Sequence, residues 1–232
     1  MAPAADLAER LGLQFSDLTL LTQALVHSSY LHEQPSAGQS NERLEFLGDS
    51  VISLIISEAL WQRHPDDDEG SLTTRRAAIV SARGLSRIAQ RLELGSYLYL
   101  GLGAAAAGER ARKSVLAATF EAVTGAIYLE FGLDRTRTWL LAVAEPEISE
   151  PNTVDALKPS KSVLQELSYA RTGRAPHYRL VSDEGPAHAR QYVVEALVGG
   201  EPLGQGTGRS RREAETEAAR EAILALERST TD

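Results

Sequence analysis

Apolar residues recur every three or four positions along most of the first 143 residues, which is the pattern of amphipathic helices. The expected helices span residues 7–13, 17–33, 43–64, 71–92 and 115–131. The third of these is apolar on most of its surface after Asp49, so we expect it to be buried inside a helical bundle.

The pattern changes after residues 144–159, a stretch with three prolines, several acids and no apolar periodicity. Such a stretch is typical of a linker. Beyond it, helical and alternating patterns predict a second unit of order α-β-β-β-α. The patterns place a helix at 161–171, strands at 178–182 and 189–199, a turn at 199–208 and a helix at 209–227, and leave the third strand without bounds.

The fold class that follows is a two-domain protein, all-α and then α+β. We expect the helical domain at residues 1–147, a linker at 148–156 and the α+β domain at 157–229. On one stripe of the final helix, small and apolar residues recur at Ala214, Ala218, Ala222 and Leu226.

Composition narrows the class of protein further. The chain has no Cys, so disulfides and thiolate metal sites are excluded, and a reducing compartment fits. The first residues have neither the basic nor the apolar region of a signal peptide. The longest apolar run, at 51–60, is interrupted by polar residues and is far shorter than the roughly 20 residues of a membrane span. We therefore expect a cytoplasmic protein without a membrane partner.

The net charge of −8 argues mildly against a nucleic-acid partner. Up to residue 149 the chain has 13 Lys and Arg against 19 Asp and Glu, and from residue 150 it has 11 against 13. The second unit is therefore closer to neutrality, and local clusters of charge decide what it contacts.

The segment NERLEFLGDS (41–50) places three carboxylates on one side of a helix. At 100° per residue, Glu42, Glu45 and Asp49 fall within an arc of roughly 60°. The same face continues through apolar residues toward the core, so unpaired acids there would be costly. One interpretation is a solvated acidic start of a helix, which the helix dipole favours. The other is a divalent cation with oxygen ligands, such as Mg²⁺ or Mn²⁺.

Glu121 favours the second interpretation. It lies inside an otherwise apolar helical stretch, and Gly125 one turn later would allow another helix to approach closely. A carboxylate in that setting requires a metal ion or a basic partner. Clusters of acids that hold Mg²⁺ serve phosphoryl chemistry above all, because the metal neutralises phosphate and acidifies water.

These residues resemble the ribonuclease III family of nucleases. NERLEFLGDS matches the family's signature, and three companion segments follow the family's order: ALVHSSY (24–30), DEGSLT (68–73) and VLAATFEAVTGAIYLE (115–130). The unit after the linker resembles a double-stranded RNA-binding domain. The resemblance covers nearly the whole chain.

The resemblance implies a role for each acid. Glu45 and Glu121 match carboxylates that bind the catalytic Mg²⁺, with Mn²⁺ as a possible substitute, and Asp49 matches one that is essential for hydrolysis. Glu42 and Glu69 match acids that line the cleavage site. The family acts as a homodimer, and an aromatic residue in the place of Phe46 packs at the dimer interface.

The resemblance also implies the reaction, which is endonucleolytic cleavage of double-stranded RNA. The products carry 5′-phosphate and 3′-hydroxyl ends with a short 3′ overhang, and the targets are precursors of ribosomal RNA and other structured RNAs, messengers included. One position departs from the family. Ala118 stands where the family has an Asp that joins Glu45 and Glu121 around the metal.

Three surfaces of the second unit are candidates for contact with an RNA duplex. The first is a polar line on the helix at 161–171, formed by Ser162, Gln165, Glu166 and Tyr169. The second is His188 in the loop between the first two strands, and the third is the cluster Arg209, Arg211 and Arg212 at the start of the final helix. Basic residues at a helix start oppose the helix dipole, so a phosphate partner is expected there. In the RNA-binding domains that the unit resembles, the first two surfaces meet successive minor grooves and the third bridges the phosphates between them.

Two alternatives to a nuclease remain open. The first is a dimer that binds duplex RNA but is catalytically impaired because of Ala118. The second is a helical phosphohydrolase for small molecules, which leaves the arginine cluster of the second unit unexplained.

Overall fold

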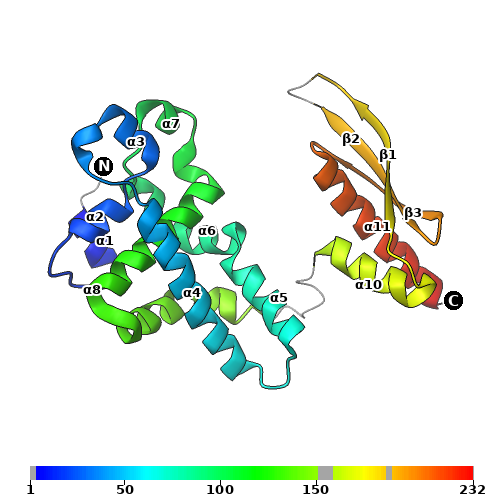
Figure 1. The fold of residues 1–232 in the computed structure, drawn as a ribbon, viewed down its shortest axis with the longest axis horizontal. Coiled ribbons are helices and arrows are strands. Elements are labelled where there is room, and N and C mark those ends of the chain that lie inside the picture. Colours follow the sequence, from blue (N-terminus) through cyan, green and yellow to red (C-terminus); the bar gives the residue numbers. More distant parts are fainter. Residues whose placement is uncertain (1–3, 151–158, 187–189, 232) are drawn as a thin grey trace. The chain divides into compact units, whose positions relative to one another are not determined.

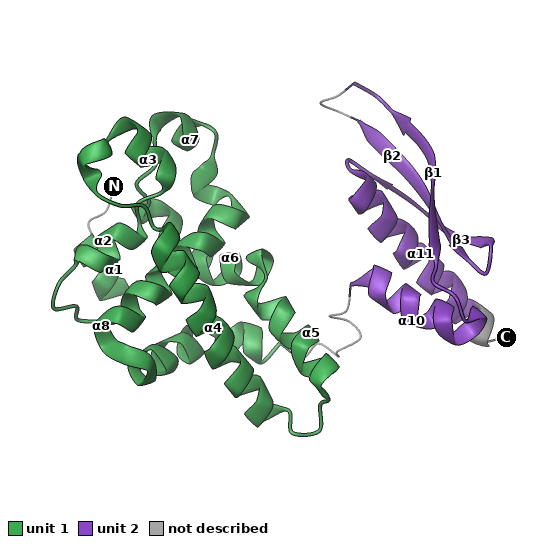
Figure 2. Cartoon of the chain, viewed as in Figure 1, with its two compact units in different colours: residues 1–151 green, residues 152–232 purple. Residues whose placement is uncertain are grey.

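The computed structural model describes residues 4–150, 159–186 and 190–231, with side chains as far as residue 228. The chain divides into two compact units, Met1–Pro151 and Asn152–Asp232, which Figure 2 distinguishes by colour. Each unit has its own hydrophobic core and is described by itself.

The first unit consists of helices (Figure 1). Its α-helices are α1 (Ala4–Arg10), α2 (Thr19–Ala24), α3 (Ser28–Glu33), α4 (Glu42–Arg63), α5 (Glu69–Val80), α6 (Ala82–Arg91), α7 (Leu102–Ala106) and α8 (Lys113–Ile148). Single 3-10 turns are η1 (Pro35–Ala37), η2 (Leu94–Tyr97) and η3 (Glu109–Ala111). The all-α architecture predicted for this unit is confirmed.

Helices α4 and α8 cross at the centre of the unit and form most of its core (Figure 1). Two glycines allow the close approach. A β-carbon on Gly48 would overlap the carbonyl oxygen of Glu121, and one on Gly125 would overlap that of Leu44. The role predicted for Gly125 is therefore confirmed, and Gly48 is its counterpart on the other helix.

Helix α8 is long and apolar enough to span a membrane by length and composition alone. However, 61% of its most apolar stretch is buried within the unit. The backbone is also non-helical at Gly132, where φ is 75°. Figure 1 shows that the chain turns back there, so that the second half of α8 packs beside the bundle rather than extending the first. These are the features of a core helix of a helical bundle.

Two of the predicted helices are each divided in two. The helix expected at 71–92 is broken at Ser81, where the backbone is extended. The side-chain oxygen of Ser81 caps α6 by accepting a hydrogen bond from the N–H of Gly84. The helix expected at 17–33 is broken at Leu25–His27, because Val26 forms a parallel bridge with Tyr99. Both breaks depend on local caps or distant partners that helical periodicity does not contain.

Helix α8 continues into the proline-containing stretch 144–159 and ends at Ile148, the first residue of the expected linker. Residues 144–148 form the last turn of α8, with Ala144, Glu147 and Ile148 buried. Arg91 on α6 holds the Glu147 carboxylate through two hydrogen bonds of 2.6 Å. The remainder of the expected linker, from residue 151, lies outside the described residues.

The second unit is an antiparallel three-stranded sheet covered on one face by two helices (Figure 1). Its elements are α10 (Ser160–Thr172), β1 (His177–Glu184), β2 (Gln191–Val198), β3 (Glu201–Gly208) and α11 (Arg211–Thr231). The predicted order α-β-β-β-α is confirmed. The stretch 199–208, expected as a turn, contains a turn only at Gly199–Gly200, and the rest is strand β3.

Helix α11 lies on β3 with almost no separation between their backbones. A β-carbon at Gly204 or Gly206 would overlap backbone atoms of Ala218. The residues of the predicted stripe, Ala214, Ala218, Ala222 and Leu226, are all buried in this contact. This close packing fixes the start of α11 relative to the sheet.

Candidate functional site

The crossing of α4 and α8 brings together carboxylates that are distant in the sequence. Glu45 lies in the first turn of α4 and Glu121 in the buried part of α8, and both side chains are half-buried. Asp49, one turn after Glu45, is exposed. The core residues Ile52 and Ile56 continue the same face of α4. The acids therefore lie at the rim of the core, as the sequence predicts.

Burial and mutual repulsion both disfavour the charged forms of these carboxylates. Burial, and then the charges of Glu45 and Asp49, raise the pKa of Glu121 from its ordinary 4.5 to about 7. Burial also raises the pKa of Glu45, with further repulsion from Glu42 and Asp49, while His27 acts in the opposite direction. The pKa shifts of both residues thus reflect burial and mutual repulsion, which His27 offsets only in part and only at Glu45.

Within the described parts of the chain, no Lys or Arg forms an ion pair with Glu45, Asp49 or Glu121. Half-buried carboxylates that repel one another fit a divalent cation in both charge and donor type. Across the described residues, no three Asp, Glu or His side chains lie close enough together to hold a metal ion by themselves. Ala118, three residues before Glu121 on α8, offers no ligand. The donors therefore suit a hard cation, with water in the positions that protein oxygens leave.

Glu42 adds negative charge to this cluster, because it also repels Glu45. It is exposed at the first residue of α4, and the hydroxyl of Ser40 donates a 2.8 Å hydrogen bond to its carboxylate. His27 caps α3, where its Nδ1 accepts the N–H of Ser29. His27 therefore has a structural role at the start of a helix.

Glu69 does not join the acidic cluster of its own chain. It is the first residue of α5, and it lines a groove of roughly 580 Å³ between α5 and the second half of α4. The other residues of the groove include Leu54, Glu58, Trp61 and Arg76. The predicted set of acids is therefore divided between two places on the first unit.

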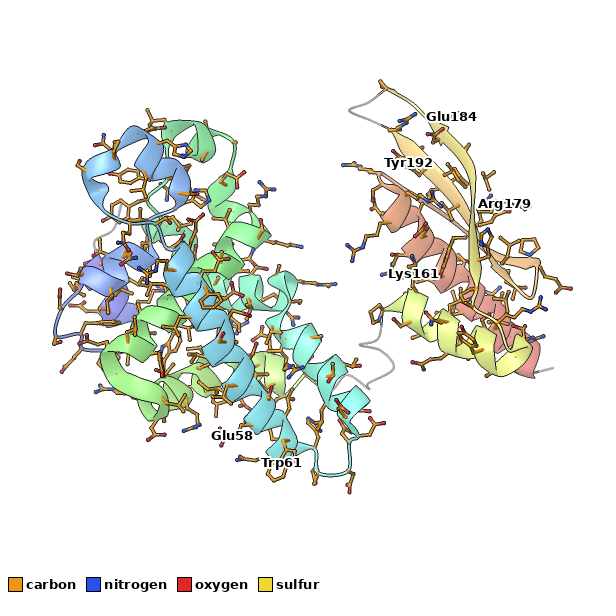
Figure 3. All side chains as sticks on the ribbon, in the orientation of Figure 1. Glu58, Trp61, Lys161, Arg179, Glu184 and Tyr192 are labelled. Atoms are coloured by element: carbon orange, nitrogen blue, oxygen red, sulfur yellow. The ribbon has the colours of Figure 1, made fainter. Side chains whose placement is uncertain are left out.

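Phe46 is 79% exposed, although it lies beside the buried face of α4. Leu54 and Trp61 follow it by eight and fifteen residues, are 55% and 70% exposed, and share its side of the helix within roughly 80°. Figure 3 shows Trp61 at the far end of α4, directed away from the bundle. Sequence reasoning identified Phe46 alone, but the helical spacing of these three residues could have revealed the stripe.

In the second unit, α10 presents the predicted polar line to solvent. Ser162, Gln165, Glu166 and Tyr169 are exposed, whereas Leu164 on the opposite side is buried. The second predicted surface, at His188, lies outside the described residues.

The arginine cluster lies at the start of α11, where the sequence places it. Arg209 precedes α11, and its backbone N–H donates a 2.8 Å hydrogen bond to the Glu213 carboxylate. The backbone N–H of Glu213 in turn donates to the hydroxyl oxygen of Ser210. Glu213 and Ser210 thereby occupy the backbone N–H groups of Arg209 and Glu213 at the start of α11. Arg212 is exposed, and Arg211 pairs with Glu215 at 3.0 Å. This surface offers an anion the exposed side chain of Arg212.

Comparisons with known proteins agree with both units. Residues 17–145 match the family model "Ribonuclease-III-like", and residues 160–226 match "Double-stranded RNA binding motif". A ribonuclease 3 from Dehalococcoides mccartyi strain 195 is 40% identical over 232 residues, which are 100% of this chain and 98% of the relative. One from Natranaerobius thermophilus is 42% identical over 221 residues, 95% of each chain.

Among solved structures, the nuclease domain of ribonuclease III from Campylobacter jejuni is 34% identical, with a TM-score of 0.58. The match covers 62% of this chain and 98% of that domain. That structure is described as showing flexibility in a region involved in dimer formation.

Proposed function

The chain belongs to the ribonuclease III family of endoribonucleases, which act on double-stranded RNA, and we propose that it hydrolyses the phosphodiester bonds of RNA duplexes at the Glu45–Glu121 cluster with Mg²⁺. One observation carries the proposal. Glu121 is held half-buried against Glu45 with its pKa raised to about 7, and no Lys or Arg of the described chain pairs with it. Such an arrangement is costly unless it serves a cation.

We assign the metal to Glu45 and Glu121, with Mn²⁺ as a substitute for Mg²⁺. The bound ion would lower the pKa of water and neutralise charge on the phosphate. Asp49, exposed one turn from Glu45, would orient the attacking water and accept its proton. Glu42 and Glu69 would line the cleavage site. Since Glu69 lies at the α4–α5 groove, it would reach an acidic cluster only across a contact with another chain.

That requirement supports a homodimer. The exposed stripe of Phe46, Leu54 and Trp61 runs along α4 from the acidic cluster to the groove that contains Glu69. Three large apolar side chains on one helix face are typical of a protein interface. We propose that Phe46 packs in this interface and that a second copy of the chain covers the stripe.

The second unit would hold the duplex. Its polar line on α10 supports contact with a minor groove, and the exposed arginine side chains at the start of α11 support contact with phosphates. His188 is assigned to the second minor groove by the family resemblance alone. The domain bounds 1–147 and 157–229, with the linker between them, belong to the same proposal.

We further propose that cleavage leaves 5′-phosphate and 3′-hydroxyl ends with short 3′ overhangs, as the family resemblance implies. Precursors of ribosomal RNA and other structured RNAs in the cytoplasm would be the substrates. Cleavage of a long RNA duplex in Mg²⁺, compared with the Glu121→Gln variant, tests the reaction.

A second candidate function is favoured by one specific observation. Ala118 supplies no oxygen to the cluster, and the described residues contain no group of three ligands. The chain would then be a dimer that binds duplex RNA with impaired catalysis. Both candidates require binding of duplex RNA, so only a cleavage measurement separates them.

A further inference from the structure

Glu215 lies between two of the surfaces assigned to RNA in the second unit. Its Oε2 accepts a 2.6 Å hydrogen bond from Lys161 at the start of α10, and its Oε1 accepts a 3.0 Å bond from the Nε of Arg211 at the start of α11. The Glu215 side chain is only 15% exposed. One carboxylate therefore ties together the starts of two helices.

Lys161 is fixed from a third side as well. Its ammonium group lies 4.7 Å from the centroid of the Tyr178 ring on β1. The Tyr178 hydroxyl is buried without a hydrogen-bond partner in the described part of the chain, so the ring contributes its face rather than a hydrogen bond. A cation over an aromatic face is stabilised by the ring quadrupole. Figure 3 shows Lys161 where the start of α10 approaches α11.

We propose that Glu215 is a positioning residue for the recognition of duplex RNA. It holds Lys161, which is next to Ser162 of the polar line, at a fixed separation from Arg211 of the arginine cluster. This inference rests on the proposed RNA-binding function of the second unit. It adds a residue that acts through its neighbours and does not itself contact RNA.

Both the shape and the charge of this surface bear on RNA binding. Recognition of an A-form duplex depends on matching the separation of its grooves and phosphates, so two protein surfaces must be held at a set distance. Ion pairs that hold each side chain in one orientation provide this. A carboxylate next to a phosphate-binding surface also repels RNA. Electrostatics alone therefore predicts that loss of Glu215 strengthens binding, whereas positioning predicts that binding weakens.

The test uses the full-length chain with EDTA, which prevents cleavage, and an RNA duplex and a DNA duplex of the same sequence. Fluorescence anisotropy gives the affinity at several salt concentrations for the chain and for Glu215→Gln. The matched control is Glu217→Gln, on the same helix. Among the described residues, Glu217 forms an ion pair only with Arg220 of α11, at 2.9 Å.

We expect Glu215→Gln to bind the RNA duplex about tenfold more weakly, the effect of losing one charge-assisted hydrogen bond. Its preference for RNA over DNA should fall, while Glu217→Gln should bind as well as the unaltered chain or slightly better. Unchanged or tighter binding by Glu215→Gln would overturn the proposal. If the unaltered chain does not bind duplex RNA, it is the proposed function that fails.

A second comparison separates positioning from stability. Thermal unfolding shows whether Glu215→Gln is folded, and Lys161→Met disrupts the same contact from the other helix. The double variant should bind as weakly as Glu215→Gln alone, because both changes remove one shared contact. Losses that add, or a loss of affinity that appears only at temperatures where the variant unfolds, would contradict the proposal.

Discussion

Gly48 on α4 and Glu121 on α8 meet where the two helices cross, so closely that a β-carbon at position 48 would overlap the Glu121 carbonyl oxygen. The same β-carbon would lie 3.1 Å from the backbone nitrogen of Gly125. Because Glu45 precedes Gly48 by one turn, this backbone contact is what brings Glu45 near Glu121. The packing of the core and the assembly of the acidic cluster are one structural feature.

Gly48→Ala should therefore destabilise the first unit by about 3 kcal/mol, because the helices must separate or strain to admit a methyl group. Chemical denaturation measures the change. Gly103→Ala is the control, since Gly103 lies in α7 with nothing within 4 Å of an added β-carbon. A helical glycine with free space should tolerate alanine without loss of stability. Equal effects of the two changes would refute the account of the crossing.

Glu121 should make the stability of the metal-free protein depend on pH. Its pKa is about 7 in the folded chain, above the ordinary value of 4.5. The folded state therefore holds this proton more tightly than the unfolded state does. The stabilising contribution is complete below about pH 4.5, is lost as the pH rises through 7, and changes no further above that.

Urea unfolding in EDTA from pH 5 to pH 8 measures this effect. The unaltered chain should lose more stability over that range than Glu121→Gln, which has no proton to release. Addition of Mg²⁺ at pH 8 should restore stability to the unaltered chain, because the cation offsets the repulsion. Parallel curves for the two proteins would mean that Glu121 is not the group that titrates.

Phe46→Ala should weaken the dimer by about 2 kcal/mol, the effect of removing an aromatic anchor from an interface. Sedimentation velocity over a range of protein concentrations should show a shift toward monomer. Leu129→Ala is the control, because Leu129 is also exposed but lies on α8 and not on the face of α4 that carries the stripe. An unchanged dimer in Phe46→Ala would remove Phe46 from the interface.

Arg212→Ala should weaken binding of RNA duplexes regardless of their sequence. It should also lower the slope of log affinity against log salt by about one, as expected for the loss of one phosphate contact. Arg179→Ala is the control, since Arg179 pairs with Glu195 across β1 and β2 and should leave the slope unchanged. If Arg212→Ala leaves the slope unaltered, Arg212 does not contact phosphate.

Much of this architecture could be predicted from the sequence, because its main signals are local and periodic. The burial of α4 after Asp49 and the stripe of small residues on α11 both follow from helical spacing. The break at Ser81 could not be read from periodicity, since the apolar pattern continues through it while a side-chain cap ends one helix and begins the next. The break after Ala24 depends on Tyr99, which lies 73 residues beyond Val26.

In the candidate site, too, local features could be predicted from the sequence and features that depend on packing could not. Three acids on one face of α4 are visible in the sequence, and so is the unusual position of Glu121. That Glu69 lies in a different groove from Glu45 depends on how α5 packs against α4, which spacing does not determine. The bridge from Lys161 to Glu215 joins residues 54 positions apart, and no local pattern indicates it.

The central claim is that the Glu45–Glu121 cluster hydrolyses duplex RNA, and the most direct test is cleavage of a long RNA duplex in Mg²⁺ and in Mn²⁺. The unaltered chain should cleave it to fragments with 5′-phosphate ends, and Glu121→Gln should abolish cleavage while the affinity for the duplex in EDTA stays the same. Ala118→Asp should increase the rate at low metal concentration, because it adds a carboxylate next to the cluster. No cleavage by the unaltered chain in either metal, with activity only after Ala118→Asp, would contradict the claim and identify the protein as a dimer that binds duplex RNA without cutting it.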